Sequence, residues 1–388
     1  MSSDFATLAK DIHNGLIVVD THVDTILRQL DLGHDLASAG TAGYMDIPSM
    51  KEGNLTVSFF AACVDYHNVM RGTGRQRQEN IINAVLAFCD RNSAQVELAR
   101  SESEIRRIAA AGKLAIVLTI EGAQAIEDDL QSLQGLWDQG VRSIALAHFS
   151  SNGWADSSAD VVRHGGLSEL GRRAIKEMNR LGILIDVSHA SDAATLQAID
   201  ASAAPLIASH SSARALHDHP RNLTDDLIKA IAKRGGIIGP TAFPEYIYAP
   251  FQQALEVRAA AILQSPDNTL PAGDGTPAIT TVMRSYRGDM QGKYNSLVLE
   301  AIPMPGIDVF IDHIVHVAEL VGPQHVCIGT DHGAVRFDIP EWETCAKLPF
   351  ITEKLLQRGF SASEVGLIMG ENVLRLMDDV LQAAGTPE

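Results

Sequence analysis

Eight short runs of apolar and β-branched residues recur along the chain, and segments of helical period separate most of them. The runs occupy residues 15–22, 55–62, 114–121, 141–148, 182–189, 204–210, 235–242 and 325–331. Strands that alternate with helices are typical of repeated βα units around a parallel sheet. Eight such strands predict an α/β fold of the closed (β/α)8 type, the TIM barrel.

The expected helices lie at 78–111, 167–181, 191–201, 224–234 and 305–321, with a C-terminal helical segment at about 351–383. Gly182 and Gly235 stand where a helix would end, a position that favours left-handed backbone. Residues 243–303 break the rhythm and predict a long insertion after the seventh strand, either a lid or an exposed excursion. Since no linker-like stretch divides the 388 residues, we expect one domain over 1–388.

Charge and composition exclude some classes of protein. A formal net charge of -17 argues against a nucleic-acid partner, because such binding needs a basic stripe. No run approaches the roughly 20 apolar residues of a membrane span, and residues 1–15 lack the pattern of a secretory signal. We therefore expect a cytoplasmic protein. The isolated cysteines, Cys63, Cys89, Cys327 and Cys345, predict buried free thiols.

Metal-binding and acid–base side chains fall at the carboxyl ends of the predicted strands. They are His22, Asp24, Glu121, His148, His189, His210 and Asp331. In a barrel of this kind, the carboxyl ends of all strands open onto one face. His22 and Asp24 are two positions apart, which places both side chains on the same side of one strand. We expect the whole group to form a single site.

Imidazoles combined with carboxylates favour a borderline ion such as zinc over magnesium or calcium, which prefer all-oxygen shells. The candidate ligands are His22, Asp24, Glu121, His189 and His210. They exceed the four ligands of one tetrahedral ion, which predicts two zinc ions bridged by Glu121. Two ions about 3.5 to 4 Å apart can hold a hydroxide and polarise a carbonyl for hydrolysis. Asp331 is the candidate general base and acid, and His148 the candidate oxyanion donor.

Seven longer motifs are VVDTHVD, TIEGAQAI, LAHFSSNGWADSS, HGGLSELGRRAIKEMNRLGILIDVSHAS, IASHSSARALHDHPRNLTDDLI, HIVHVAELVGPQHVCIGTD and GENVLRLM. Together they resemble the membrane dipeptidase (renal dipeptidase) family of binuclear zinc peptidases, part of the amidohydrolase superfamily, in its bacterial form. The resemblance covers about residues 15 to 375, apart from 243–303. It implies that His22 and Asp24 hold one zinc, that His189 and His210 hold the other, and that Glu121 bridges them.

The same resemblance implies roles toward substrate. His148 would contact the substrate near the oxyanion, Asp331 would transfer the proton, and Arg221 in HPRNLTDD would bind the terminal carboxylate, a task that suits the guanidinium fork. The implied reaction is hydrolysis of dipeptides with a free C-terminal carboxylate, with a D residue tolerated at the second position. The implied assembly is a homodimer.

The chain also departs from the family pattern. The family commonly shows GxDFDG after the eighth strand, whereas this chain reads GTDHG, with His332 in place of the aromatic residue and no second Asp. Strand four ends in His148 with no lysine nearby, which disfavours the carboxylated-lysine bridge of dihydroorotase-type and urease-type centres. Three alternatives remain: a hydrolase of N-acyl amino acids or another small amide, a mononuclear deaminase, and a catalytically silent barrel used in binding or assembly.

Overall fold

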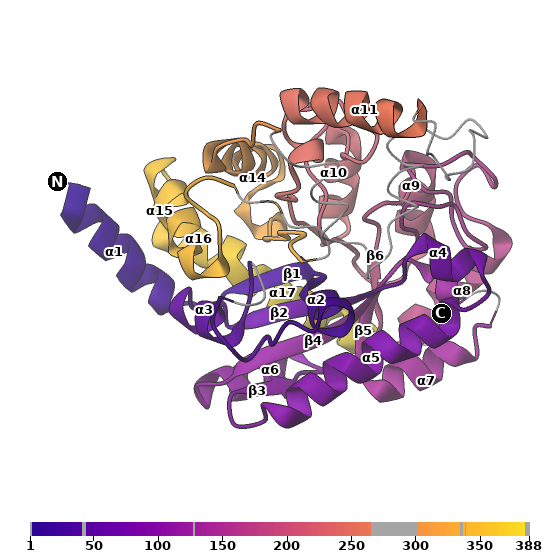
Figure 1. The fold of residues 1–388 in the computed structure, drawn as a ribbon, viewed down its shortest axis with the longest axis horizontal. Coiled ribbons are helices and arrows are strands. Elements are labelled where there is room, and N and C mark those ends of the chain that lie inside the picture. Colours follow the sequence, from indigo (N-terminus) through magenta and orange to yellow (C-terminus); the bar gives the residue numbers. More distant parts are fainter. Residues whose placement is uncertain are drawn as a thin grey trace.

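One curled parallel sheet forms the centre of the protein, and helices lie around it (Figure 1). The computed structural model describes residues 2–40, 44–126, 129–264, 302–333, 337 and 339–384. The strands are β1 (Val19–Val23), β2 (Val57–Cys63), β3 (Val96–Leu98), β4 (Leu114–Glu121), β5 (Val141–Ala145), β6 (Leu184–Asp186), β7 (Ile207–Ala208) and β8 (Ile237–Ile238). Neighbours follow the order β1-β2-β4-β5-β6-β7-β8, and β3 pairs with β4 outside this path. The expected α/β class and parallel sheet are confirmed.

The eighth expected strand, residues 325–331, does not form a regular strand, yet its backbone contacts both ends of the sheet. The Cys327 N–H donates to the Ile238 carbonyl of β8 at 2.9 Å. The Thr21 N–H of β1 donates to the Ile328 carbonyl at 2.8 Å. This segment therefore lies between β8 and β1, although its hydrogen bonds are too irregular to count as a strand.

The helices vary in length from one turn to five. They are α1 (Ser2–Asn14), α2 (Thr25–Leu32), α3 (Ile47–Glu52), α4 (Tyr66–Met70), α5 (Gly74–Arg91), α6 (Glu102–Ala110), α7 (Ser132–Gln139), α8 (Glu169–Leu181), α9 (Asp192–Ala201), α10 (Asp225–Lys233), α11 (Ala249–Gln264), α14 (Ile307–Val321), α15 (Pro349–Gln357), α16 (Ala362–Gly366) and α17 (Asn372–Ala383). In Figure 1, α5, α6 and α7 lie on one side of the sheet, and α10, α11 and α14 lie on the opposite side.

The expected helix at 78–111 was wrong in its extent. Helix α5 ends at Arg91, β3 follows, and α6 begins only after Ser101, whose side chain accepts a hydrogen bond from the Glu104 N–H and caps the new helix. The C-terminal segment at about 351–383 is helical but divided among α15, α16, a π-helical turn at Leu367–Glu371 and α17. Of the expected insertion at 243–303, residues 265–301 lie outside the described residues.

Helix α17 covers the amino ends of the strands. Its Leu374 and Met377 belong to an apolar cluster with residues near the strand starts, among them Val19, Val57 and Ile207. A larger apolar cluster fills the space between the sheet and the surrounding helices. Burial of apolar surface is the main favourable contribution to folding, so this packing holds the strands in place and leaves their carboxyl ends for other groups.

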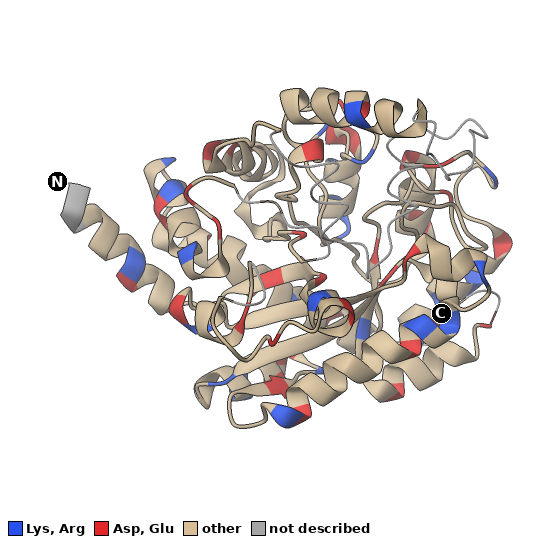
Figure 2. Cartoon of the chain, in the orientation of Figure 1, with Lys and Arg blue, Asp and Glu red and all other residues tan. Residues whose placement is uncertain are grey.

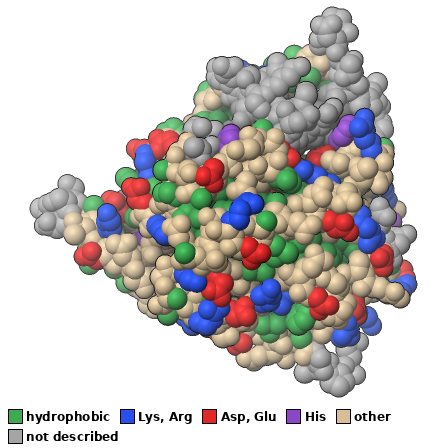
Figure 3. All heavy atoms as spheres, turned by 60° about the horizontal axis from the view of Figure 1, so that its bottom comes forward, with side chains coloured by type: hydrophobic (Ala, Val, Ile, Leu, Met, Phe, Trp, Pro, Cys, Tyr) green, Lys and Arg blue, Asp and Glu red, His purple; other side chains and the backbone are tan. Residues whose placement is uncertain are grey.

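Charged side chains of both signs are interspersed along the outer helices (Figure 2). The face at the bottom of Figure 1 likewise carries mixed charges between small apolar groups (Figure 3). Within the described ranges, no helix has both the length and the apolar character needed to cross a membrane. The four cysteines are buried and free, as expected.

Candidate metal centre

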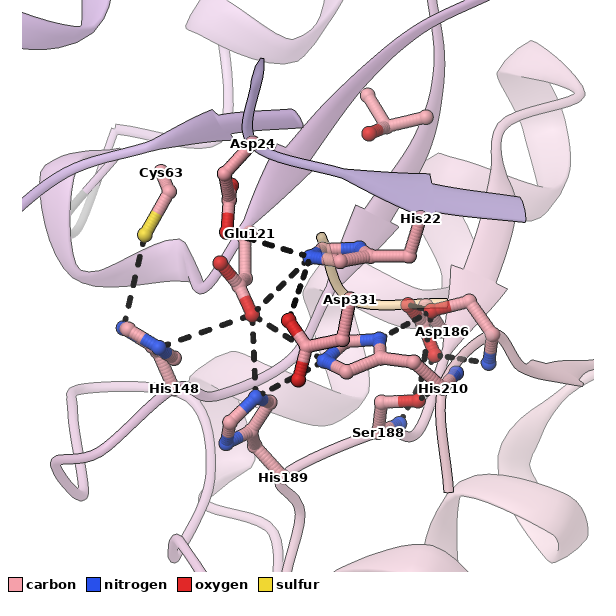
Figure 4. A network of polar contacts seen from close by, with 12 residues as sticks. His22, Asp24, Cys63, Glu121, His148, Asp186, Ser188, His189, His210 and Asp331 are labelled. Atoms are coloured by element: carbon pink, nitrogen blue, oxygen red, sulfur yellow. Dashed lines mark hydrogen bonds and ion pairs between the residues drawn. The ribbon is translucent and has the colours of Figure 1, made fainter. Parts of the chain in front are cut away.

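Seven polar groups surround the carboxyl ends of the strands (Figure 4). His22 lies in β1, Glu121 is the last residue of β4, and Asp24 follows β1 directly. The other four lie in the segments that follow strands or bridge the sheet: His148 after β5, His189 after β6, His210 after β7, and Asp331 beyond residue 328. The fold therefore brings together all seven residues that the sequence places at strand ends.

Glu121 is the centre of this group. Its Oε1 atom lies 3.0 Å from Nε2 of His189, 3.3 Å from Nε2 of His210, 3.4 Å from Nε2 of His22 and 3.6 Å from Nε2 of His148. The Nε2 atoms of His189 and His210 are 3.0 Å apart. Four imidazole nitrogens from four different segments thus point toward one buried carboxylate.

Two carboxylates extend the group on the His22 side. Oδ2 of Asp24 lies 3.9 Å and Oδ1 of Asp331 lies 4.0 Å from Nε2 of His22. Ligand atoms of His22, Asp24 and Asp331 lie within 4.8 Å of one another, as do those of His22, Glu121 and His210. These spacings are those of groups that can share a metal ion.

Several buried atoms in the group lack hydrogen-bond partners among the described residues. They are Oε2 of Glu121, Oδ1 of Asp24, Nε2 of His22 and Nδ1 of His189. An unsatisfied buried polar atom costs about 1 to 3 kcal/mol. The donor set of imidazoles and carboxylates is that of a zinc-type site, and a cation among them would satisfy these atoms. The residues present therefore fit a bound metal.

The charge states of His189 and His210 suit metal binding. Burial lowers the pKa of both His189 and His210 well below the ordinary value, so these imidazoles are neutral and can offer a lone pair. Burial alone would also lower the pKa of His22, but Glu121, Asp24 and Asp331 outweigh it and raise the pKa to about 10. His22 thus carries a proton that it must lose in order to act as a metal ligand.

The two acids at the centre behave oppositely. Burial would raise the pKa of Glu121, but the neighbouring histidines outweigh that effect and hold it well below the ordinary value. For Asp331, burial dominates and raises the pKa to about 7, with Glu121 acting in the same direction. The Asp331 side chain is 16% exposed and its Oδ2 accepts a hydrogen bond from Thr241. A carboxyl group with a pKa near neutrality can both accept and release a proton.

The orientation of His210 depends on a buried carboxylate behind it. The Ser209 hydroxyl donates to Oδ2 of Asp186, and Oγ of Ser209 lies 2.8 Å from Nδ1 of His210. A hydroxyl has one proton, so Ser209 must accept from His210 and Nδ1 must carry the hydrogen. The His210 Nε2 lone pair then points toward Glu121, as a metal ligand requires.

A second buried carboxylate, Asp20, accepts a similar set of hydrogen bonds. Asp20 accepts from the His22 N–H and from both the N–H and the hydroxyl of Thr330, just as Asp186 accepts from the Ser188 N–H and from the N–H and hydroxyl of Ser209. Burial raises the pKa of Asp20 to about 6. Our sequence reasoning missed both carboxylates. The available signal was an acid inside an otherwise apolar strand run, in IVVDTH and ILIDVSH.

Two site residues have left-handed backbone, with φ of 66° at His189 and 63° at Asp331. Residues other than glycine rarely adopt a left-handed backbone conformation, and the exceptions cluster at functional sites. The Ser158 N–H holds the His189 carbonyl at 2.8 Å, and the Asp331 N–H donates to the His22 carbonyl at 3.1 Å. These bonds hold two turns that aim the side chains at the site.

A cavity opens beside the group. Its lining includes Asp24, Glu121, His148, His189 and Asp331, together with the apolar side chains Leu27, Val64, Phe149 and Phe243 and the polar residues Cys63, Asp65, Tyr66, Arg77, Gln124, Ser150 and Tyr246. The candidate metal ligands thus face a space that a small molecule can enter. Apolar side chains and acidic side chains therefore line the same cavity.

Arg221 lies behind His210 rather than in the cavity wall. Its guanidinium donates to the His210 carbonyl at 2.7 Å and to Oγ of Ser211 at 2.6 Å, and it stands 5.5 Å from the Tyr246 ring centre. Arg221 is 4% exposed, and no carboxylate of the described chain lies within 4.0 Å of it. Asp331, Asp186 and Glu121 attract this charge only from a longer range, and Nε of Arg221 has no hydrogen-bond partner among the described residues, so this position can accommodate an anionic ligand.

His332, the departure from the family pattern, is fully enclosed. Its ring stacks on Tyr44 at 3.4 Å and on Phe337 at 4.2 Å between ring centres, and burial lowers its pKa well below the ordinary value. Its carbonyl accepts the Asp24 N–H at 3.0 Å. The imidazole therefore occupies an aromatic packing position and belongs to none of the candidate metal groups among the described residues.

Comparisons with known proteins agree with this geometry. The family model described as Membrane dipeptidase (Peptidase family M19) matches residues 7–387. The dipeptidase verJ of Clonostachys rogersoniana is 28% identical over 352 residues, which cover 87% of this chain and 76% of verJ. The crystal structure of the probable dipeptidase PvdM from Pseudomonas aeruginosa has a TM-score of 0.83 and 27% identity, covering 99% of this chain and 100% of that one.

A further solved structure shares the fold at lower identity. It is a metallo peptidase from Rhodobacter sphaeroides liganded with a phosphinate mimic of the dipeptide L-Ala-D-Ala. Its TM-score is 0.74 at 21% identity, and the match covers 94% of this chain and 99% of that chain.

Proposed function

This chain belongs to the membrane dipeptidase family, peptidase family M19, and we propose that it hydrolyses the peptide bond of dipeptides with a free C-terminal carboxylate. The observation that carries this proposal is the convergence of four imidazoles on Glu121 beside a cavity. We further propose that the curled sheet is a (β/α)8 barrel, since residues 326–332 hydrogen-bond to strands at both of its ends.

We propose two zinc ions as cofactors. His22 and Asp24 would hold one ion, His189 and His210 the other, with Glu121 shared between them. The convergence of the His22, His189 and His210 nitrogens on Glu121, with Asp24 3.9 Å from His22, supports this assignment. The second Glu121 oxygen, Oε2, has no hydrogen-bond partner among the described residues and would be free to act as a further ligand. When bound, such ions supply Lewis acidity toward a carbonyl and lower the pKa of water to near neutrality.

The protein's own residues account for the remaining steps. His148, at the cavity wall, would donate a hydrogen bond to the carbonyl oxygen as negative charge develops there. Asp331 would carry the proton to the departing amine, which its pKa near neutrality supports. Arg221 would hold the terminal carboxylate, which its burial without a carboxylate partner in the described chain supports.

The cavity favours a dipeptide over other small amides. Asp331, which lines the cavity outside the proposed ligand set, would attract the cationic α-amine of a dipeptide, which an N-acyl amino acid lacks. A D residue at the second position is part of the proposal, because the Rhodobacter sphaeroides neighbour was liganded with an L-Ala-D-Ala mimic. We also propose a homodimer, which the molar mass in solution tests.

A second candidate is hydrolysis of N-acyl amino acids on the same metal centre. It is supported by the apolar part of the cavity wall, where Leu27, Val64, Phe149 and Phe243 would accommodate an acyl chain. In both candidate functions Arg221 would bind the substrate carboxylate. The two substrate classes differ at the other end, where a dipeptide has a free α-amine and an N-acyl amino acid has an acyl group.

A substrate panel on the zinc-loaded protein tests the proposal. The panel holds L-Ala-L-Ala, L-Ala-D-Ala, the amide of each, and N-acetyl-alanine, with ninhydrin or mass-spectrometric detection of the products. We expect hydrolysis of the free dipeptides and at least a tenfold lower rate for their amides, about 1.4 kcal/mol. Faster hydrolysis of N-acetyl-alanine would favour the second candidate, and no hydrolysis of any member would contradict both.

A further inference from the structure

The cavity wall holds a second group of metal-binding atoms, of which the proposed reaction uses His148 and Glu121 but not Cys63. The Sγ atom of Cys63, at the end of β2, lies 3.9 Å from Nδ1 of His148. Ligand atoms of Cys63, His148 and Glu121 all lie within 4.8 Å of one another. All three residues line the cavity. This group therefore faces the same space as a bound substrate would.

This group lies on the other side of Glu121 from the main cluster. In Figure 4, Cys63 and His148 stand on one side of the Glu121 carboxylate, and His22, Asp331 and His210 stand on the other. All four imidazole contacts to Glu121, that of His148 included, use Oε1, whereas Oε2 is buried and has no hydrogen-bond partner among the described residues. In the same view, the Glu121 oxygen without a dashed line lies on the side of Cys63.

The spacing of the sulfur and the nitrogen suits a shared ion. In a tetrahedral zinc site, with bonds of about 2.3 Å to sulfur and about 2.0 Å to nitrogen, the two ligand atoms stand about 3.5 Å apart, and a larger ion such as cadmium places them further apart. The observed 3.9 Å needs only a small side-chain rotation. A thiolate is a soft ligand and selects soft or borderline ions, so a site with Cys63 would prefer thiophilic cations over magnesium or calcium.

We propose that Cys63 and His148, with Glu121, form an inhibitory site for thiophilic divalent cations such as cadmium. Coordination forms a metal–sulfur bond and breaks the S–H bond of Cys63, and the proton leaves to solvent. The bound ion takes a nitrogen lone pair of His148 and fills the part of the cavity in front of Glu121. The consequence for hydrolysis rests on the proposed function, whereas binding of the cation does not.

Cadmium titration of the zinc-loaded protein tests this proposal. The first readout is the ultraviolet charge-transfer band between thiolate and cadmium, and the second is the initial rate on a dipeptide. The test variants are Cys63→Ala and Cys63→Ser, the latter differing from the wild type by one atom. The matched control is Cys89→Ala, because Cys89 is also buried and free but lies within α5 in the apolar core.

We expect the band to rise to one equivalent in the wild type and in Cys89→Ala, and to be absent from both Cys63 variants. Half-inhibition of the Cys63 variants should need at least ten times more cadmium, each variant being compared with its own uninhibited rate. A band in the Cys63 variants, no band in the wild type, or equal inhibition of all forms would overturn the proposal. A protein without dipeptidase activity would contradict the proposed function, while the band would still decide the cadmium site.

Discussion

Ser209 accepts a hydrogen bond from Nδ1 of His210 across 2.8 Å, because the single Ser209 proton is already donated to Asp186. The direction of this bond determines which nitrogen of His210 can bind a metal. Asp186, Ser209 and His210 therefore form a chain of hydrogen bonds. Such outer-sphere partners commonly orient metal-binding histidines.

Ser209→Ala removes the acceptor for the His210 Nδ1 hydrogen and leaves the tautomer unspecified. We expect metal affinity to fall about 10-fold to 100-fold, the usual effect of losing such a partner. Competition with a chelator measures it. Ser143→Ala is the control, since Ser143 is a buried serine on β5 whose hydroxyl donates to the Leu184 carbonyl instead of contacting an imidazole nitrogen as Ser209 does. An equal loss in both variants would contradict the role of Ser209.

Glu121→Gln removes the carboxylate charge at the centre of four imidazoles. A direct ligand should cost more than the roughly 100-fold upper range of outer-sphere partners, so we expect loss of metal and of nearly all turnover. Metal content by mass spectrometry and the rate on a dipeptide are the measurements. Near-normal activity with retained metal would exclude Glu121 as the bridge.

Asp331→Asn keeps the shape of the side chain but removes its ability to carry a proton. Loss of a general acid–base group costs about 10²-fold to 10⁴-fold in rate, and we expect kcat to fall in that range. Metal content should remain close to that of the wild type, because Asp331 lies outside the proposed ligand set. If metal is lost together with activity, Asp331 is a ligand and the proposed role is wrong.

Arg221→Lys retains a positive charge but loses the guanidinium fork. We expect KM for dipeptides to rise about tenfold, which corresponds to about 1.4 kcal/mol, with a smaller change in kcat. Steady-state kinetics separate the two parameters. An unchanged KM would mean that the buried guanidinium only supports the His210 carbonyl and the Ser211 hydroxyl.

The free energy of unfolding should decrease as the pH falls, because the buried His313 favours the neutral imidazole. Burial, with the nearby charge of His217 as the next cause, lowers the pKa of His313 from 6.5 to about 4, and its Nδ1 accepts the Ala213 N–H at 3.1 Å. The folded state thus favours the neutral form, whereas the unfolded chain takes up a proton as the pH falls below 6.5. The stability contributed by the neutral form is lost between pH 6.5 and about 4 and amounts to roughly 3 kcal/mol.

His313→Asn keeps an acceptor near the Nδ1 position and does not titrate. Urea unfolding at pH 7.5 and pH 4.5 should therefore show a smaller difference for His313→Asn than for the wild type. His67→Asn, on α4 where no residue is buried, is the control and should behave as the wild type. The same pH dependence in all three proteins would rule out His313 as the cause.

The sequence by itself determined the α/β class, the parallel strands and the residues at their ends. Buried parallel strands are continuous apolar runs, so they can be recognised in the sequence. In a barrel of parallel strands, the carboxyl ends of all strands lie on one side. His22, Glu121 and His210 were identified in this way. The helix expected at 78–111 failed because β3 is only three residues long, too short for its apolar pattern to be distinguished from a helix.

Only the tertiary structure decided which atoms face one another. Asp186 and Ser209 are separated by 23 residues, and Asp20 and Thr330 by 310, so no local pattern shows that each pair is hydrogen-bonded. The same holds for Cys63, an ordinary apolar-run cysteine in the sequence that lies against His148 in the fold. Periodicity records the face on which a side chain lies, whereas its partner across the sheet depends on strand order and register, which are properties of the whole fold.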